Sequence, residues 1–457
     1  MRPRGGGVAA IMEASGPATA GVSIETLLDD RPVGAMQLRA MILCGLVALL
    51  DGMDLQLASL LVPTMSAQWH RPPSDFGFVL AFGLVGLVGA AATIAPLGDR
   101  IGRRTLIVAG FFLAGVGAGL TGTASNLTIA ALCRLLTGVG LGISLPNATA
   151  MASEVAPARA RSTLIIAVYA NMGIGAIIGG FVTPPILTAF GWRGVFFTGG
   201  GLSLALTLAL VLFLPESPVF LASRLRLGKE ARERLRRSWP DLPAERITAR
   251  VVRDGRVRMR DVLALRYRNA TLLLWFVYFL ITFVFYVLLS WLPVLLHAVG
   301  WTIADAITGA VTLSIGGVAA GLVQGWYADR GSTVPALLSG LTISILALVG
   351  FSVLPPDRIP WTILIALVGA GVSGGIFVLA ALSARIYDTQ IRAGGIGIAS
   401  AVARLGAIVA PLAGSTLLAW QVSPTELLAL LAIPLAVALL ALALFARHFR
   451  LPDEHAG

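Results

Sequence analysis

The sequence is poor in charged residues, histidine and cysteine, and each shortage excludes a class of protein. Asp, Glu, Lys and Arg make up only 12% of the chain, while 57% is hydrophobic, whereas soluble proteins are about 25% charged. This balance excludes a soluble globular protein. The histidines are scattered and the two cysteines fall in apolar runs, so we expect no metal centre, no disulfide framework, no cofactor and no enzymatic activity. The residues concerned are His70, His297, His448, His455, Cys44 and Cys133.

Long apolar runs are abundant instead, in two groups of six separated by a polar stretch. A helix that spans a membrane needs about 20 predominantly apolar residues, and every run has roughly that length. The sequence therefore predicts an all-α integral membrane protein with twelve transmembrane helices. The runs lie near 39–63, 76–98, 104–124, 126–152, 162–186 and 194–214, and then near 269–295, 303–327, 334–354, 361–384, 394–418 and 425–446.

These runs divide the chain into five parts. Two six-helix bundles are flanked by polar tails and joined by a basic loop, in which we expect an amphipathic helix around 228–239. The predicted parts are an N-terminal tail 1–37, a first bundle 38–214, the loop 215–268, a second bundle 269–446 and a C-terminal tail 447–457.

The arginines are distributed unevenly between the two sets of loops. One set, which includes the central loop, carries most of them, and the other carries little beyond Arg71, Arg193 and Arg358. Basic loops stay on the cytoplasmic side, so we predict both tails and the central loop to be cytoplasmic, in a bacterial-type inner (plasma) membrane. The net charge of +11 belongs to these loops, so we expect contact with the lipid bilayer and no nucleic-acid partner.

The two bundles repeat one another at an offset of about 230 residues. The GDR at 98–100 matches ADR at 328–330, and GVG at 138–140 matches GAG at 369–371. Paired six-helix repeats suit a transporter whose halves rock around a site near the middle of the bilayer. A channel or a membrane enzyme has no need of this repeat.

Three short segments carry a family resemblance. GDRIGRR at 98–104, RLLTG at 134–138 and LPESP at 214–218 are similar to motifs of the major facilitator superfamily. The chain departs from those motifs at Ala95, where a glycine is usual, and at Val219, where an arginine is usual. The resemblance implies two pseudo-symmetric six-helix bundles around a central cavity.

Within that superfamily the chain resembles the aromatic acid:proton symporter family of 4-hydroxybenzoate and benzoate transporters. The similar segments are DGMD at 51–54, LPNAT at 145–149, IRAGG at 391–395 and RLG at 404–406. The resemblance implies proton-coupled import of a small aromatic carboxylate by alternating access, with the proton gradient as driving force, and we expect a monomer. Two alternatives stay open: a proton symporter for a non-aromatic organic acid or sugar-like solute, and a non-transporting membrane sensor.

Ionisable side chains within the apolar runs are the candidates for proton coupling, because each costs about 2.5–3.5 kcal/mol to insert. Asp51 and Asp54 lie three residues apart on one helix face. Two close carboxylates in a low dielectric do not both ionise easily, so we expect the pair to share a proton. Arg134 resembles the superfamily arginine linked to coupling. The alternatives are a structural aspartate pair and a snorkelling arginine.

Arg404 and several polar or aromatic residues are the candidates for substrate binding. A guanidinium binds a planar carboxylate through two hydrogen bonds, so Arg404 would hold the substrate, or else pair internally with Asp51 or another acidic residue. Tyr278 and Tyr286 stand at helical spacing and would stack on a ring, or belong to an interfacial belt. Asn147 and Asn171 would line the cavity.

Charged residues at the cytoplasmic helix ends are the candidates for gating. We predict that they form ion pairs between the two halves that hold one access state and break in the other, with topology-setting charge as the alternative. These residues are Asp99, Arg103, Glu154, Asp329, Arg385 and Arg392.

Overall fold

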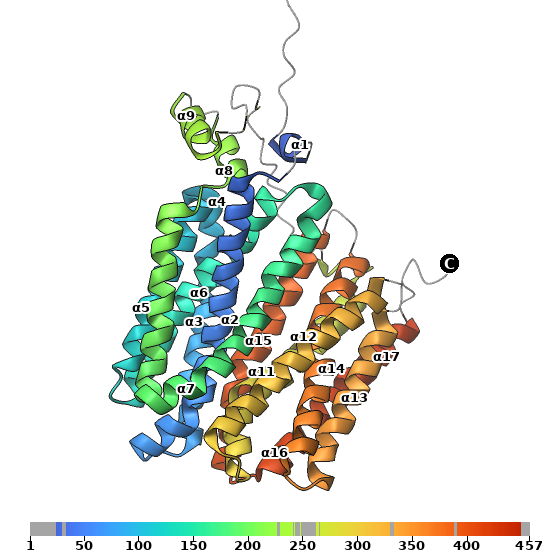
Figure 1. The fold of residues 1–457 in the computed structure, drawn as a ribbon. Helices are drawn as coiled ribbons and strands as arrows, with labels where there is room; N and C mark the ends of the chain where they lie inside the picture. Colours follow the sequence, from blue (N-terminus) through green and yellow to red (C-terminus); the bar gives the residue numbers. More distant parts are fainter. Residues whose placement is uncertain are drawn as a thin grey trace, which may run out of the picture.

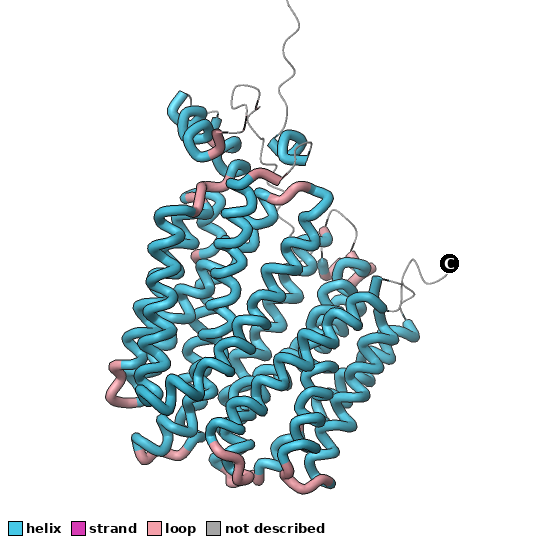
Figure 2. The backbone as a smooth tube through the Cα atoms, viewed as in Figure 1, coloured by secondary structure: helices cyan, strands magenta, loops and turns pink. Residues whose placement is uncertain are grey.

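The computed structural model is built from helices arranged in two bundles that stand side by side (Figure 1; Figure 2). It describes residues 24–29, 33–225, 229–240, 242, 247, 262–264, 266–329, 333–387 and 391–448. The long helices of the first half are α2 (Ala35–Trp69), α3 (Gly77–Thr93), α5 (Arg103–Gly122), α6 (Leu127–Val155) and α7 (Ala158–Phe213). Those of the second half are α11 (Arg268–Ala298), α12 (Ile303–Asp329), α13 (Thr333–Val353), α14 (Arg358–Ile386), α15 (Arg392–Ala419) and α17 (Ala432–His448).

Helix α7 crosses the membrane twice. Within the described residues, eleven helices are long and apolar enough to span, and the apolar part of α7 alone covers 44 residues. At a rise of 1.5 Å per residue this is about 66 Å, roughly twice the hydrocarbon thickness. Gly191 breaks the helix with φ 67° and ψ −178°, a backbone conformation that glycine adopts freely. The predicted twelve crossings in an all-α fold are therefore confirmed.

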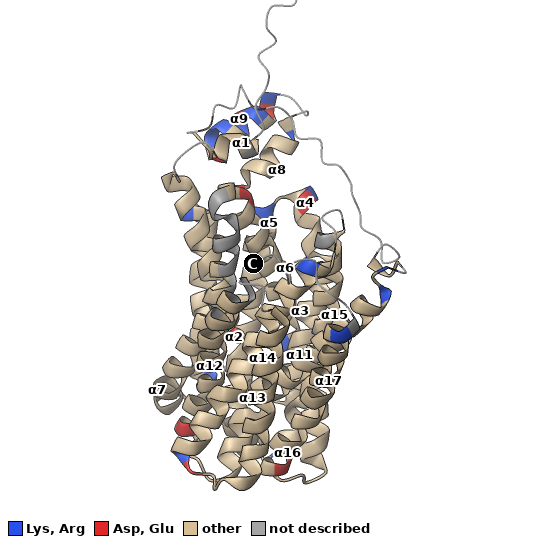
Figure 3. Ribbon diagram, turned by 90° about the vertical axis from the view of Figure 1, so that its right-hand side faces the viewer, with Lys and Arg blue, Asp and Glu red and all other residues tan. Residues whose placement is uncertain are grey.

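Short helices mark the two ends of the bundles. One end, called the basic end here, carries α4 (Gly98–Ile101) and the loop helices α8 (Pro218–Ser223) and α9 (Lys229–Ser238). Lys and Arg gather there on α9 and beside α4 and α5 (Figure 3). The opposite end carries η1 (Pro73–Phe76) and α16 (Pro424–Leu430).

The loop helices pack onto the basic end of the first half. Leu221 of α8 and Leu235 of α9 share one buried cluster with Val47 of α2 and Met151 of α6, and α1 (Ile24–Asp29) adds Ile24 and Leu28. The amphipathic helix predicted in the central loop is confirmed as α9, which buries Ala231 and Leu235.

The two halves share an apolar core toward the opposite end. The shared cluster takes Met53, Leu57 and Leu61 from α2 and joins them to Trp291 and Leu295 of α11. The cluster at the basic end, by contrast, contains residues of the first half and the loop alone. The apolar seal between the halves therefore lies away from the basic end.

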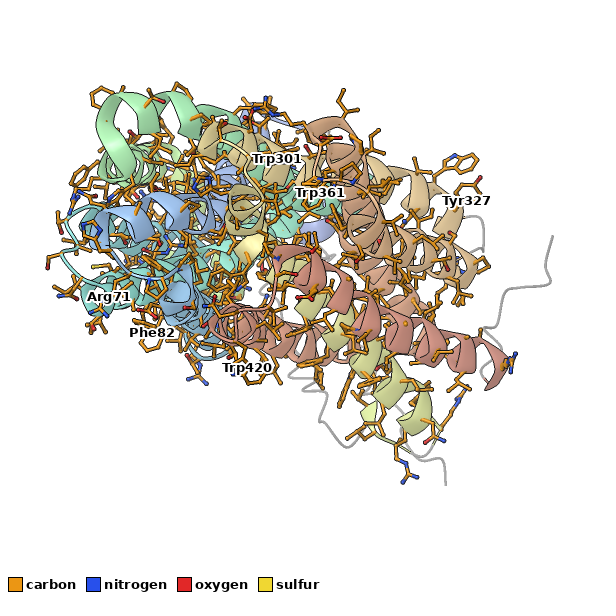
Figure 4. All side chains as sticks on the ribbon, turned by 90° about the horizontal axis from the view of Figure 1, so that it is seen from below. Arg71, Phe82, Trp301, Tyr327, Trp361 and Trp420 are labelled. Carbon is orange, nitrogen blue, oxygen red and sulfur yellow. The ribbon has the colours of Figure 1, made fainter. Side chains whose placement is uncertain are left out.

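A polar contact completes this seal. The Ser415 hydroxyl of α15 donates to the Ser74 carbonyl oxygen of η1 at 2.8 Å, and Gly77 lies directly against Ser415. Seen from the opposite end, Phe82, Tyr327 and Trp420 lie on the outer surface, whereas Trp301 and Trp361 are buried (Figure 4). Exposed aromatic and aliphatic side chains on the outside of the bundles fit a surface that faces lipid.

Glycines bring α2 and α7 into backbone contact in the first half. A Cβ on Gly52 would lie 1.8 Å from the Met172 carbonyl oxygen, and one on Gly175 would lie 1.8 Å from that of Leu49. Small residues allow such close helix packing in a membrane. Gly52, which lies between the two aspartates, thus admits a neighbouring helix rather than a ligand.

We expect Gly52→Ala to destabilise the protein by about 1–3 kcal/mol, because the added methyl meets rigid backbone. Gly119→Ala is the matched control, since nothing lies within 4 Å of a Cβ there. Thermal unfolding of the purified protein in detergent measures the difference. Equal melting temperatures for the two variants would show that the α2–α7 packing is looser than described.

Candidate functional site

A buried ion pair joins two helices of the first half. Both terminal nitrogens of Arg134 on α6 donate to the Asp54 carboxylate on α2, at 3.0 and 2.9 Å. Arg134 is 5% exposed and Asp54 6%. A two-point bond of this kind satisfies both charges and fixes their geometry. Asp54 is therefore neutralised within its own half.

Asp51, one turn earlier on the same helix, is left without such a partner. It is 1% exposed, and neither carboxylate oxygen has a hydrogen-bond partner among the described residues. It interacts electrostatically with Asp54 and with Arg404. From the sequence we predict that Asp51 and Asp54 share a proton as a pair. The structure places them in different surroundings, because Arg134 pairs with Asp54 alone.

Arg404 and Tyr286 face Asp51 from the second half. Arg404 is half-buried on α15 and forms no ion pair with the part of the chain that the structure describes. Tyr286 on α11 interacts electrostatically with both Arg404 and Asp51. A cation and a carboxylate without an ion-pair partner among the described residues, and a phenol, therefore lie within electrostatic range of one another where the two halves join. This group is called the central site below.

A narrow pocket lies beside the central site. Helices α2, α3 and α6 of the first half form most of it, and Tyr286, Leu289 and Ser290 of α11 close it from the second half. Arg134 also lines it. The pocket and the central site therefore share Tyr286.

Three other predicted substrate residues make their contacts within their own half. Tyr278 is 4% exposed and interacts with Ser383 of α14. The Asn147 amide donates to the carbonyl oxygens of Ala95 at 3.1 Å and of Ile143 at 2.8 Å. Asn171 donates to a carbonyl oxygen of its own helix. The structure does not bring these side chains to Asp51 and Arg404.

The first three gating candidates form one network at the basic end. Arg103 pairs with Asp99 and, at 3.0 Å, with Glu154, and Glu154 accepts a hydrogen bond from the Ser217 hydroxyl. In this structure these three residues pair with one another, because α4, α5 and α6 belong to one bundle. Ion pairs between the halves in another access state stay a prediction.

Glu216 is a member of this network that the sequence analysis did not single out. It accepts from the backbone N–H groups of Arg104 at 3.1 Å and Ser217 at 2.9 Å. Burial raises its pKa above the usual range, although these hydrogen bonds oppose the shift. Its position in the LPESP motif at 214–218 was the sequence feature that could have identified it.

The remaining gating candidates belong to the second half. Arg385 is half-buried near the end of α14. Asp329 ends α12 and Arg392 begins α15, and the side chains of both lie outside the described residues.

Several polar residues near the site were missed by the sequence analysis. Gln56 Oε1 on α2 is buried without a hydrogen-bond partner among the described residues. Ser59 and Ser290 line the pocket. Such residues give a weak sequence signal, because serine and threonine in a membrane helix commonly bond to their own helix.

Comparisons with known proteins identify the family of the chain. The family model of the Major Facilitator Superfamily matches residues 44–380. The 4-hydroxybenzoate transporter PcaK of Pseudomonas aeruginosa is 32% identical over 92% of this chain and 95% of its own. The gallate transporter of Pseudomonas putida is 32% identical over 93% and 95%, and the 3-(3-hydroxy-phenyl)propionate transporter of Escherichia coli is 33% identical over 82% and 86%.

Solved structures share the fold at low identity. The xylose transporter XylE of E. coli, in a partially occluded inward-open conformation, superposes with a TM-score of 0.69 at 17% identity, over 92% of this chain and 99% of its own. These matches confirm the resemblance found in the motifs. They also confirm the expectation that the chain is not an enzyme, because the family and these relatives are transporters.

We expect Arg134→Met to destabilise the protein by about 3–5 kcal/mol, because it leaves a buried carboxylate unpaired. Adding Asp54→Leu to it should restore much of that loss, since both charges are then gone. Melting temperatures of the two single variants and the double variant form the test. If the destabilisation of the double variant equals the sum of the two single destabilisations, the two side chains are not energetically coupled.

Proposed function

Because the chain belongs to the aromatic acid transporters of the major facilitator superfamily, we propose that it imports a small aromatic carboxylate together with protons. The observation that carries the proposal is the central site, in which neither Asp51 nor Arg404 forms an ion pair with the described residues. Buried charges without partners are costly. A protein keeps them where a ligand supplies the missing partner.

Arg404 binds the substrate carboxylate in this proposal. Its planar guanidinium matches a carboxylate through two parallel hydrogen bonds, which a lysine cannot reproduce. Tyr286 interacts with Arg404 and offers an aromatic face next to the bound anion. Carboxylate and ring are thereby recognised by two helices of the second half.

Asp51 carries the proton. When it is charged, Asp51 attracts Arg404 and competes with the substrate for it. When it is protonated, Arg404 is left to the substrate anion. Proton and anion binding therefore favour one another, and this mutual dependence is what symport requires. Asp54 does not compete in this way, because Arg134 already holds it.

Alternating access follows from how the halves join. With the basic end in the cytoplasm, the apolar seal and the Ser415–Ser74 contact close the outer side, and in this proposal substrate and proton leave the site toward the inside. Rocking of the halves reverses this. The inner membrane potential supplies about 2.3 kcal/mol per charge per 100 mV, so no cofactor beyond the proton gradient is needed. One chain contains both halves, so a monomer suffices.

Asp51→Asn should lose uptake driven by a pH gradient by at least about tenfold, because its amide cannot carry a proton. It should keep substrate exchange between the two sides of the membrane, which needs no net proton movement. The measurement is uptake of labelled 4-hydroxybenzoate into proteoliposomes with an acidic exterior, in parallel with exchange at equal pH. Asp305→Asn, whose native side chain pairs with Arg358 at the opposite end, is the control. Gradient-driven uptake that survives in Asp51→Asn would exclude this role.

Arg404→Lys should raise the apparent KM for the aromatic acid by about tenfold or more, because a two-point hydrogen bond is lost while the charge is kept. Arg39→Lys is the control, since Arg39 is exposed near the start of α2. Competition by dicarboxylates and sugar acids belongs to the same assay. Stronger competition by these than by aromatic acids would favour a non-aromatic substrate, and no uptake of any acid would favour a sensor.

A further inference from the structure

The pocket beside the central site is small enough to say what it can hold. Its cavity volume is about 30 Å³, whereas a cavity needs roughly 10–15 Å³ on this measure to hold one water. A benzene ring needs a cavity several times larger. The pocket, called the notch from here on, therefore takes a hydroxyl-sized group or one or two waters, and not a ring.

The walls of the notch are leucines with a few polar groups among them. Ser59 of α2 donates its hydroxyl to the Gln56 carbonyl oxygen at 2.8 Å, so its own oxygen stays available as an acceptor. Ser290 of α11 lines the notch and forms no hydrogen bond with the residues that the structure describes. A few polar groups in an apolar wall are the usual means of orienting a small ligand.

Arg134 contributes donors to the same space. It lines the notch and gives one N–H from each terminal nitrogen to Asp54. A guanidinium carries five N–H groups, so three are left over. The notch thus presents an acceptor at Ser59, a hydroxyl at Ser290 and spare donors at Arg134, which is the complement of a hydroxyl group that both donates and accepts.

Tyr286 connects the notch to the central site. It lines the notch and interacts with Arg404, and Ser290 follows it by one helical turn on the same face of α11. A ring whose carboxylate lies on Arg404 would pass Tyr286 and point its far side toward the notch.

We propose that the notch is a subsite for a phenolic hydroxyl of the substrate, so that the protein selects hydroxylated aromatic carboxylates over unsubstituted ones. This rests on the proposed function and goes beyond it, because it assigns Ser59, Ser290 and Gly83 to substrate selection. Water fills the notch when the ring lacks the hydroxyl. The free energy of keeping or displacing this water sets the preference for hydroxylated over unsubstituted acids.

Gly83 offers a steric test that leaves the fold intact. It lines the notch on α3, and a Cβ there would meet Arg134 atoms at 3.6 to 3.8 Å, which are ordinary contacts. Gly83→Ala therefore fits the protein but fills most of a cavity of about 30 Å³. Gly89→Ala on the same helix is the matched control, since nothing lies within 4 Å of its Cβ.

The experiment compares uptake of 4-hydroxybenzoate, 3-hydroxybenzoate and benzoate by the full chain in proteoliposomes with an acidic exterior. Ser59→Ala and Ser290→Ala should each raise the KM for a hydroxylated acid by about three- to tenfold, the range of one hydrogen bond, and leave that for benzoate within twofold. Gly83→Ala should reduce uptake of a hydroxylated acid at least tenfold while benzoate is still carried. Whether uptake of 3-hydroxybenzoate or of 4-hydroxybenzoate is affected identifies which ring hydroxyl enters the notch.

Two other results have separate meanings. If the wild-type protein carries the acids but all three variants change the uptake of every acid by the same factor, the notch does not bind a hydroxyl of the substrate. The proposed function then stands. If the wild-type protein carries none of the acids, the proposed function is overturned and the hydroxyl subsite with it.

Discussion

The high cost of an unpaired charge away from water is the constraint on which the rest of the structure depends. Two hydrogen bonds lock Arg134 onto Asp54 inside the first half and meet this constraint there. Asp51 of the first half and Arg404 of the second form no ion pair with the described residues. A protein that satisfied every charge internally would have no reason to bind an ion, so the incomplete pairing at the junction of the halves is the basis of the proposed function.

Much of the fold could be predicted from the sequence, because in lipid each helix must satisfy its own backbone and is therefore visible as an apolar run. The twelve crossings were predicted in this way, whereas α9 was predicted from the amphipathic pattern of the polar central loop. The exception in detail is α7, where the two apolar runs are separated by the non-helical backbone of Gly191 alone and not by a longer loop.

The candidate site was only partly predictable. Asp51, Asp54, Arg134, Arg404 and Tyr286 stand out because they are polar in apolar runs, but nothing local states which of the aspartates Arg134 will reach across 80 residues. Asn147 shows why a polar residue in an apolar run is ambiguous: its amide donates to the Ala95 carbonyl oxygen, a contact that exists only after the surrounding helices have packed. Ser59 and Ser290 were missed because a membrane helix can absorb a serine without any function.

The asymmetry of the loop helices has a mechanical consequence. Residues of α1, α8 and α9 share a buried cluster with the first half alone, so that half is braced from outside the bilayer while the other is not braced by these helices. If the two halves rotate against each other as proposed, these helices move with the first half as one rigid unit. A molecule that binds the central loop would then add mass and contacts to the first half and leave the second half free to move.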